Sequence, residues 1–123
     1  MPMRRITDHH DGHGLAETML IEADPIDPDA GGASHHYVVS LEGAQLARMQ
    51  FWHGPRHEPG SQPGILDAVL LAIVIDRMRC FNEGPLRARE NALVLTKSEE
   101  ALHWLKHRAD ERARRGVLGQ AVP

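Results

Sequence analysis

The feature that most constrains the fold is an apolar run in the middle of the chain, Ala68–Ile75, bounded by Asp67 and Asp76. With Ile65 and Leu66 before it, the run places apolar side chains on nearly every side of a helix that we expect over 65–81. A helix that is apolar on every side must be covered on every side. A chain of 123 residues buries only a modest core, so this run predicts packing between subunits.

A break of four residues, Asn82-Glu83-Gly84-Pro85, follows this helix. Glycine supplies a left-handed helix cap and proline cannot continue the helix, so the chain must turn here. Good helix formers then extend from Leu86 to Arg115, with cationic side chains gathered in the last turn and Gly116 after it. The pattern predicts a helical hairpin over residues 64–116.

The front half of the chain has a different pattern, typical of strands. The segments LAETMLIEA, SHHYVVSLE and QLARMQFWHG each favour a strand, and residues rich in Gly, Pro and Asp separate them. The following segment, GPRHEPGSQPG, excludes helix and central strand and marks the crossing to the hairpin. We therefore expect an α+β fold, a small N-terminal antiparallel β-sheet over 15–58 followed by a C-terminal two-helix hairpin. Residues 15–119 form the single expected domain, and 1–14 a flexible polar tail.

Charge is distributed unevenly along the chain. Residues 1–76 carry 4 basic and 11 acidic side chains, whereas residues 77–115 carry 10 basic and 6 acidic ones. The hairpin is therefore the part that faces anions, while the acidic front half argues against binding of long nucleic acids. The single cysteine excludes an internal disulfide, and neither a secretory leader nor a membrane span is expected.

The nine histidines are the only candidates for metal binding or catalysis. His103 and His107 lie four residues apart on the second helix, but the His-Glu-x-x-His pattern of zinc peptidases is absent. His35 and His36 are neighbours on one strand and so point to opposite faces. We expect no metal, no cofactor and no enzymatic activity.

Four side chains of the hairpin could together bind a nucleotide: Phe81, Asn91, Arg108 and Arg112. Arg108 and Arg112 lie four apart and can converge on one anion, although they could equally be a solvated end of the helix. Asn91 could read a base edge or bond to nearby backbone, and Phe81 could stack a base or fill the core.

Helix length decides how these residues could share a ligand. Asn91 and Arg108 are 17 residues apart, which is roughly 25 Å along a helix. One nucleotide-sized ligand cannot touch both within one chain. If they share a ligand, the arginines must come from a second subunit, and an antiparallel pair of hairpins would create two equal sites per dimer.

The run FNEGPLRARENALVLTKSEEALHWLKHRADERARRGVLGQ, together with FWHGPRHEPGSQPG, resembles the phage proteins of the Thoeris anti-defence protein one family. The hairpin of that family is shared with the second anti-CBASS protein. The resemblance covers about residues 36–119 and is most specific from Phe81 to Gly116. The chain departs from the family pattern at Ser98 and after Arg115.

The resemblance implies a sponge, a protein that captures a cyclic nucleotide immune signal in the cytoplasm of the infected bacterium without cleaving it. The implied ligand is glycocyclic ADP-ribose, with cyclic trinucleotides second, held between subunits of a dimer or hexamer. Phe81 would stack adenine, Asn91 would hydrogen-bond the ligand, and Arg108 and Arg112 would hold the pyrophosphate. Two further contacts are implied, at Arg56 and, for a trinucleotide, at Arg89. The alternative is a helical-hairpin interaction module that inhibits a host protein.

Overall fold

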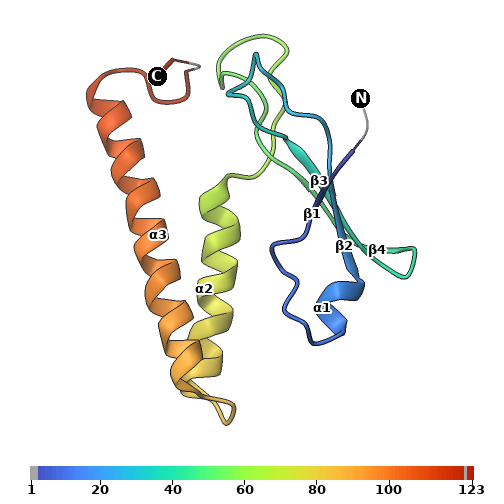
Figure 1. Ribbon diagram of the computed structural model, residues 1–123. Coiled ribbons are helices and arrows are strands. Elements are labelled where there is room, and N and C mark those ends of the chain that lie inside the picture. The colour runs from blue at the N-terminus through green and yellow to red at the C-terminus, as the bar shows by residue number, and fades with distance from the viewer. Residues whose placement is uncertain (1–2, 121) are drawn as a thin grey trace. The chain divides into compact units, whose positions relative to one another are not determined.

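The computed structural model describes residues 3–120 and 122–123 (Figure 1). It divides into two compact units. One comprises the chain up to Ile65 together with Gly119, and the other runs from Leu66 to Leu118. The first contains the β-sheet and the second the helical hairpin, so the predicted α+β class is confirmed.

The sheet has four antiparallel strands in the order β1-β2-β3-β4. The strands are β1 (Arg4–Ile6), β2 (Met19–Ala23), β3 (His36–Leu41) and β4 (Ala44–Gln50). The turn between β3 and β4 has positive φ at both Glu42 (50°) and Gly43 (82°), as the tightest hairpin turns require. The three strands that the sequence predicted are β2, β3 and β4, and all three are present.

The N-terminal region differs from the sequence-based expectation in two elements. Strand β1 lies inside the segment 1–14 and pairs with β2, with Arg5 opposite Glu22. A helical turn, α1 (Leu15–Thr18), replaces the first residues of the expected strand. The carboxylate of Glu17 accepts hydrogen bonds from the backbone N–H of Gly12 (2.6 Å) and Gly14 (3.1 Å), and these local bonds favour the turn over an extended chain.

The proline- and glycine-rich segment after β4 forms a loop, as predicted. Its ends are tied by two isolated bridges, Phe51 with Ile65 and His53 with Gln62. A Cβ atom at Gly64 would lie closer than 3.0 Å to backbone atoms of Gln50 and Phe51. Only glycine therefore allows the chain to approach itself this closely before the helices begin.

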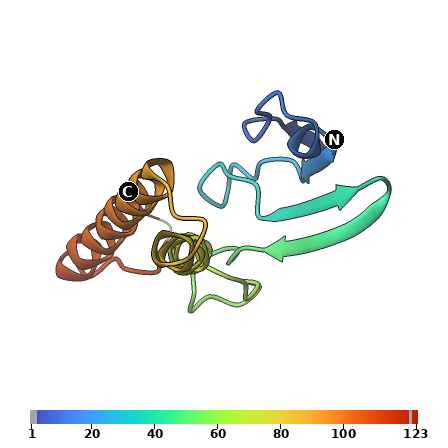
Figure 2. The same cartoon turned by 90° about the horizontal axis from the view of Figure 1, so that it is seen from below.

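The hairpin consists of α2 (Asp67–Glu83) and α3 (Arg89–Arg114), which lie side by side in both views (Figure 1 and Figure 2). Less exposed side chains recur along each helix at alternating spacings of three and four residues, the spacing of a coiled-coil seam. On α2 they are Ala68, Leu71, Ile75 and Met78, and on α3 they are Leu95, Ser98, Leu102, Leu105 and Ala109. Ile75, 3% exposed, is the most deeply buried of them.

The other face of α2 remains apolar and exposed. Leu66, Val69 and Ile73 lie on the side opposite Ile75, and Ile73 is 54% exposed. The second helix of one chain thus covers only part of α2, and the packing of this face against another subunit stays a prediction. Within residues 3–120 no helix combines the length and hydropathy that a membrane crossing requires.

Candidate functional site

The closed end of the hairpin holds Phe81 in the last turns of α2. The ring is half-buried, and the guanidinium carbon of Arg77 lies 5.5 Å from its centroid, within cation-π range. Phe81 therefore does more than fill the core, since its ring makes a cation-π contact with the planar guanidinium of Arg77. Arg77 was missed as a candidate, although its i,i+4 spacing from Phe81 could have indicated the contact.

Asn91 lies in the first turn of α3. Its side-chain amide donates a hydrogen bond to the carbonyl oxygen of Leu86 at 3.0 Å, which is the backbone contact considered as the alternative. The bond closes the loop between the helices and fixes the side chain close to the Phe81 end of the hairpin. Arg89, the first residue of α3, is exposed at the same end.

The open end of the hairpin holds Arg108 and Arg112, and their environments differ. Arg108 is exposed, whereas Arg112 is 6% exposed. The Arg112 guanidinium donates to the carbonyl oxygen of Val117 at 3.2 Å, and the Val117 N–H donates to the Arg112 carbonyl oxygen at 3.0 Å. Arg112 thus anchors the segment that follows α3. The convergence of both arginines on one anion stays a prediction.

The two ends of the hairpin are separated by an unbroken helix. Residues 89–114 form α3 without interruption, so Asn91 and Arg108 are roughly 25 Å apart along its axis. One protomer therefore has Phe81 and Asn91 at the closed end of the hairpin, where α2 ends and α3 begins, and Arg108 and Arg112 toward the other end of α3. A site that uses all four needs a second copy.

Arg56 lies in the unit that contains the sheet. Its backbone N–H donates to the carbonyl oxygen of Gly119 at 3.0 Å. A Cβ atom at Gly119 would lie 2.9 Å from the Arg56 Nε, so the side chain lies directly over this glycine. Glycine at 119 leaves room for the guanidinium of Arg56.

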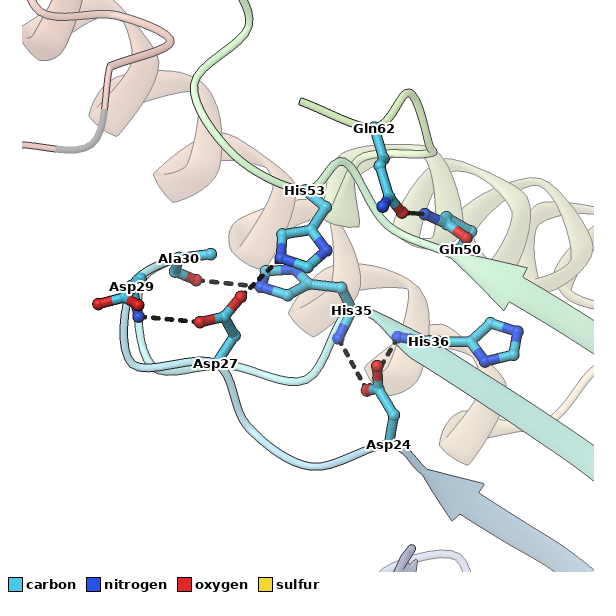
Figure 3. A network of polar contacts seen from close by, with 9 residues as sticks. All are labelled: Asp24, Asp27, Asp29, Ala30, His35, His36, Gln50, His53 and Gln62. Atoms are coloured by element: carbon cyan, nitrogen blue, oxygen red, sulfur yellow. Dashed lines mark hydrogen bonds and ion pairs between the residues drawn. The ribbon is translucent and has the colours of Figure 1, made fainter. Parts of the chain in front are cut away.

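A polar network in the same unit was not predicted (Figure 3). The Nε2 atom of His53 lies 2.7 Å from Oδ2 of Asp27, and the His53 ring stacks on His35 with centroids 4.2 Å apart. The Nε2 atom of His35 lies 3.0 Å from the Ala30 carbonyl oxygen. His36 points away and accepts a hydrogen bond from Arg48. The network holds the loop between β2 and β3 against the segment after β4.

The hydrogen bond from His53, supplemented by the Asp29 N–H, holds the pKa of Asp27 below its ordinary value. Because the pKa of Asp27 is lower in the folded state, its ionised carboxylate stabilises the fold. This stabilisation is complete above the ordinary pKa of aspartate and is lost as the pH falls through the lowered pKa. We expect His53→Ala to raise the pKa of Asp27 toward its ordinary value and so to remove most of this pH-dependent contribution. Carboxyl-carbon NMR titration measures the pKa directly. His36→Ala is the matched control, and an unchanged Asp27 pKa in His53→Ala would contradict the prediction.

Other histidines lie in the N-terminal segment and on α3. Among residues 3–120 and 122–123, no three His, Cys, Asp or Glu side chains are grouped so that they could hold a metal ion. The rings of His103 and His107 instead meet the ring of Trp104 edge to face, with centroids 5.6 and 5.5 Å away.

Comparison with known families adds to this geometry. Residues 43–109 match the family described as Acb2/Tad1, hairpin domain. The match extends from the β3–β4 turn through α2 and most of α3, which is more than half of the chain. Fold and match together define an α+β protein built on a two-helix hairpin domain. The chain belongs to the Acb2/Tad1 hairpin family.

A relative of known name supports the assignment. The protein named Thoeris anti-defense 1, from Bacillus phage SBSphiJ7, is 42% identical over 89 residues, which is 72% of this chain. The aligned part covers 62% of the relative, so this chain spans less than two thirds of its length. The resemblance predicted from the hairpin sequence is confirmed. Of the candidate residues, only Arg112 lies beyond the stretch that matches the family, which contains Arg56, Phe81, Arg89, Asn91 and Arg108.

Proposed function

We propose that this chain is a phage anti-defence protein that binds a cyclic nucleotide immune signal and sequesters it without cleavage. The observation that carries the proposal is the 42% identity to a protein named Thoeris anti-defense 1. Glycocyclic ADP-ribose is the first candidate ligand and a cyclic trinucleotide the second. The protein acts in the cytoplasm of the infected bacterium.

The chemistry of the two hairpin ends fits such a ligand. Adenine needs a flat apolar surface, and the half-buried ring of Phe81 provides one at the same end of the hairpin as Asn91. A pyrophosphate needs charge-assisted donors, and the exposed guanidinium of Arg108 supplies them in a fixed geometry. Arg112, Arg56 and, for a trinucleotide, Arg89 are further proposed contacts. In this proposal none of these side chains forms a covalent bond with the ligand, and their proposed role is tight binding rather than turnover.

The proposed site lies between subunits. The length of α3 separates the arginines from Phe81 and Asn91 within one chain. In an antiparallel pair of hairpins, the Arg108 end of one copy would lie over the Phe81 end of the other, giving two equal sites. The exposed apolar stripe of Leu66, Val69 and Ile73 offers the surface that such an assembly would bury.

Isothermal titration calorimetry with glycocyclic ADP-ribose tests the proposal. We expect saturable heat, and we expect intact ligand to be released when the complex is heated. Absence of both heat and protected ligand would refute the sponge. Recovery of a chemically altered ligand would instead establish an enzyme.

A second candidate function follows from the same apolar stripe. A hairpin with Leu66, Val69 and Ile73 exposed could dock on a host protein and inhibit it. This alternative predicts that the isolated chain stays monomeric and binds no cyclic nucleotide. Sedimentation analysis alongside the calorimetry separates the two functions.

A further inference from the structure

We infer that Trp104 is a further ligand-contacting residue, whose indole stacks on the base of the nucleotide that Arg108 holds by its phosphate. The inference rests on the proposed function and adds a second aromatic surface, in the middle of α3 and away from the Phe81 end of the hairpin. The juxtaposition of an exposed aromatic ring and an exposed arginine on one face of α3 carries it.

The exposure of Trp104 is unusual. The side chain is 64% exposed in the middle of α3, although tryptophan carries the largest apolar surface of any residue. It lies outside the seam residues Leu102 and Leu105, so it does not contribute to the packing of the hairpin. An exposed indole on a helix is typical of a surface that binds something.

The neighbouring rings orient the indole. His103 meets it at an interplanar angle of 75° and His107 at 69°, both in edge-to-face geometry. Edge-to-face contact between aromatic rings is favourable, so both histidines favour this orientation of the indole. The indole thus contacts both rings while most of its surface stays accessible.

Charge on the same face indicates the kind of ligand. Lys97 pairs with Glu100 at 3.8 Å, and Arg115 pairs with Glu111 at 2.7 Å. Across residues 3–120, no ion pair or side-chain hydrogen bond occupies the guanidinium of Arg108, one turn from Trp104. The face therefore presents one aromatic surface and one uncompensated cation about one helical pitch apart, roughly 5.4 Å, a span that a single nucleotide bridges.

Substitution of Trp104 with fluorescence and calorimetric readouts tests the inference. Glycocyclic ADP-ribose should quench the fluorescence of the wild-type protein. Trp104→Phe should keep most of the affinity and lose the quench, because Trp52 remains as the only tryptophan. Trp104→Ala should weaken binding about tenfold, the typical loss of one base-stacking contact. Leu93→Ala, which removes another exposed apolar side chain of α3, should bind as wild type.

The outcomes separate this inference from the proposed function. If the wild type binds and Trp104→Ala binds equally well, the inference fails and the sponge stands. If Trp104→Ala changes the sedimentation of the protein, Trp104 is an assembly residue and the inference also fails. If the wild type binds no glycocyclic ADP-ribose, both fail together.

Discussion

Replacement of Arg108 by alanine is expected to weaken the binding of glycocyclic ADP-ribose by about 100-fold. Arg108 is exposed on α3 and supplies charge-assisted donors to the pyrophosphate in the proposed complex. Removing one partner of such a pair leaves the other charge unpaired, which commonly costs a few kcal/mol. Isothermal titration calorimetry measures the change. Arg114→Ala, which removes the same charge near the end of the same helix, should leave the affinity close to wild type.

The same variant tests whether the site is built between chains. In a mixture with Phe81→Ala, each heterodimer would contain one intact site and one that lacks both residues. Random exchange of subunits between the two variants would then restore about one site in four. Neither variant alone should bind tightly. Absence of rescue, with heterodimers demonstrated by mass spectrometry, would show that Phe81 of one chain and Arg108 of the other do not build a shared site and would overturn the composite arrangement.

The hairpin was predictable because its determinants are local. The apolar run, the Gly84-Pro85 break and Gly116 bracket two helices, and the structure begins and ends them within three residues of the expected bounds. Gly84 ends α2 in an extended conformation, with φ −101°, so the expected left-handed cap was wrong. The length of α3 follows from the same pattern, and with it the separation of Asn91 from Arg108. Helical periodicity therefore predicted both the hairpin and the separation of Asn91 from Arg108, which is the strongest constraint on the site.

The unpredicted elements depend on contacts between distant residues. Strand β1 has only three residues, and pairing with β2 defines it rather than its own pattern. His53 and Asp27 meet across 26 residues of chain, a contact that no spacing rule indicates. The burial of Arg112 requires the chain after α3 to fold back onto it, whereas its sequence resembles a solvated helix end.

The hairpin seam positions the two ends of the proposed site, and its stability rests on few side chains. Most helical stability in proteins comes from tertiary packing, so we expect packing between α2 and α3 to stabilise both helices. The seam of α3 contains Ser98 and Ala109, which bury little apolar surface. Ile75 is consequently the side chain on which the packing depends most, because its exposure falls to 3%.

Ile75→Ala is expected to destabilise the folded hairpin by about 2–5 kcal/mol, the usual loss when a buried aliphatic side chain is truncated. Ile73→Ala is the matched control, since the same residue type two positions away is 54% exposed in the single chain. For dilute monomer the control should change the free energy of unfolding by less than about 0.5 kcal/mol. Chemical denaturation at several protein concentrations measures both. If Ile73 packs against a second copy, the effect of Ile73→Ala will grow with concentration while that of Ile75→Ala will not. Equal, concentration-independent losses in the two variants would contradict the assignment of Ile75 to the seam and Ile73 to the outer face.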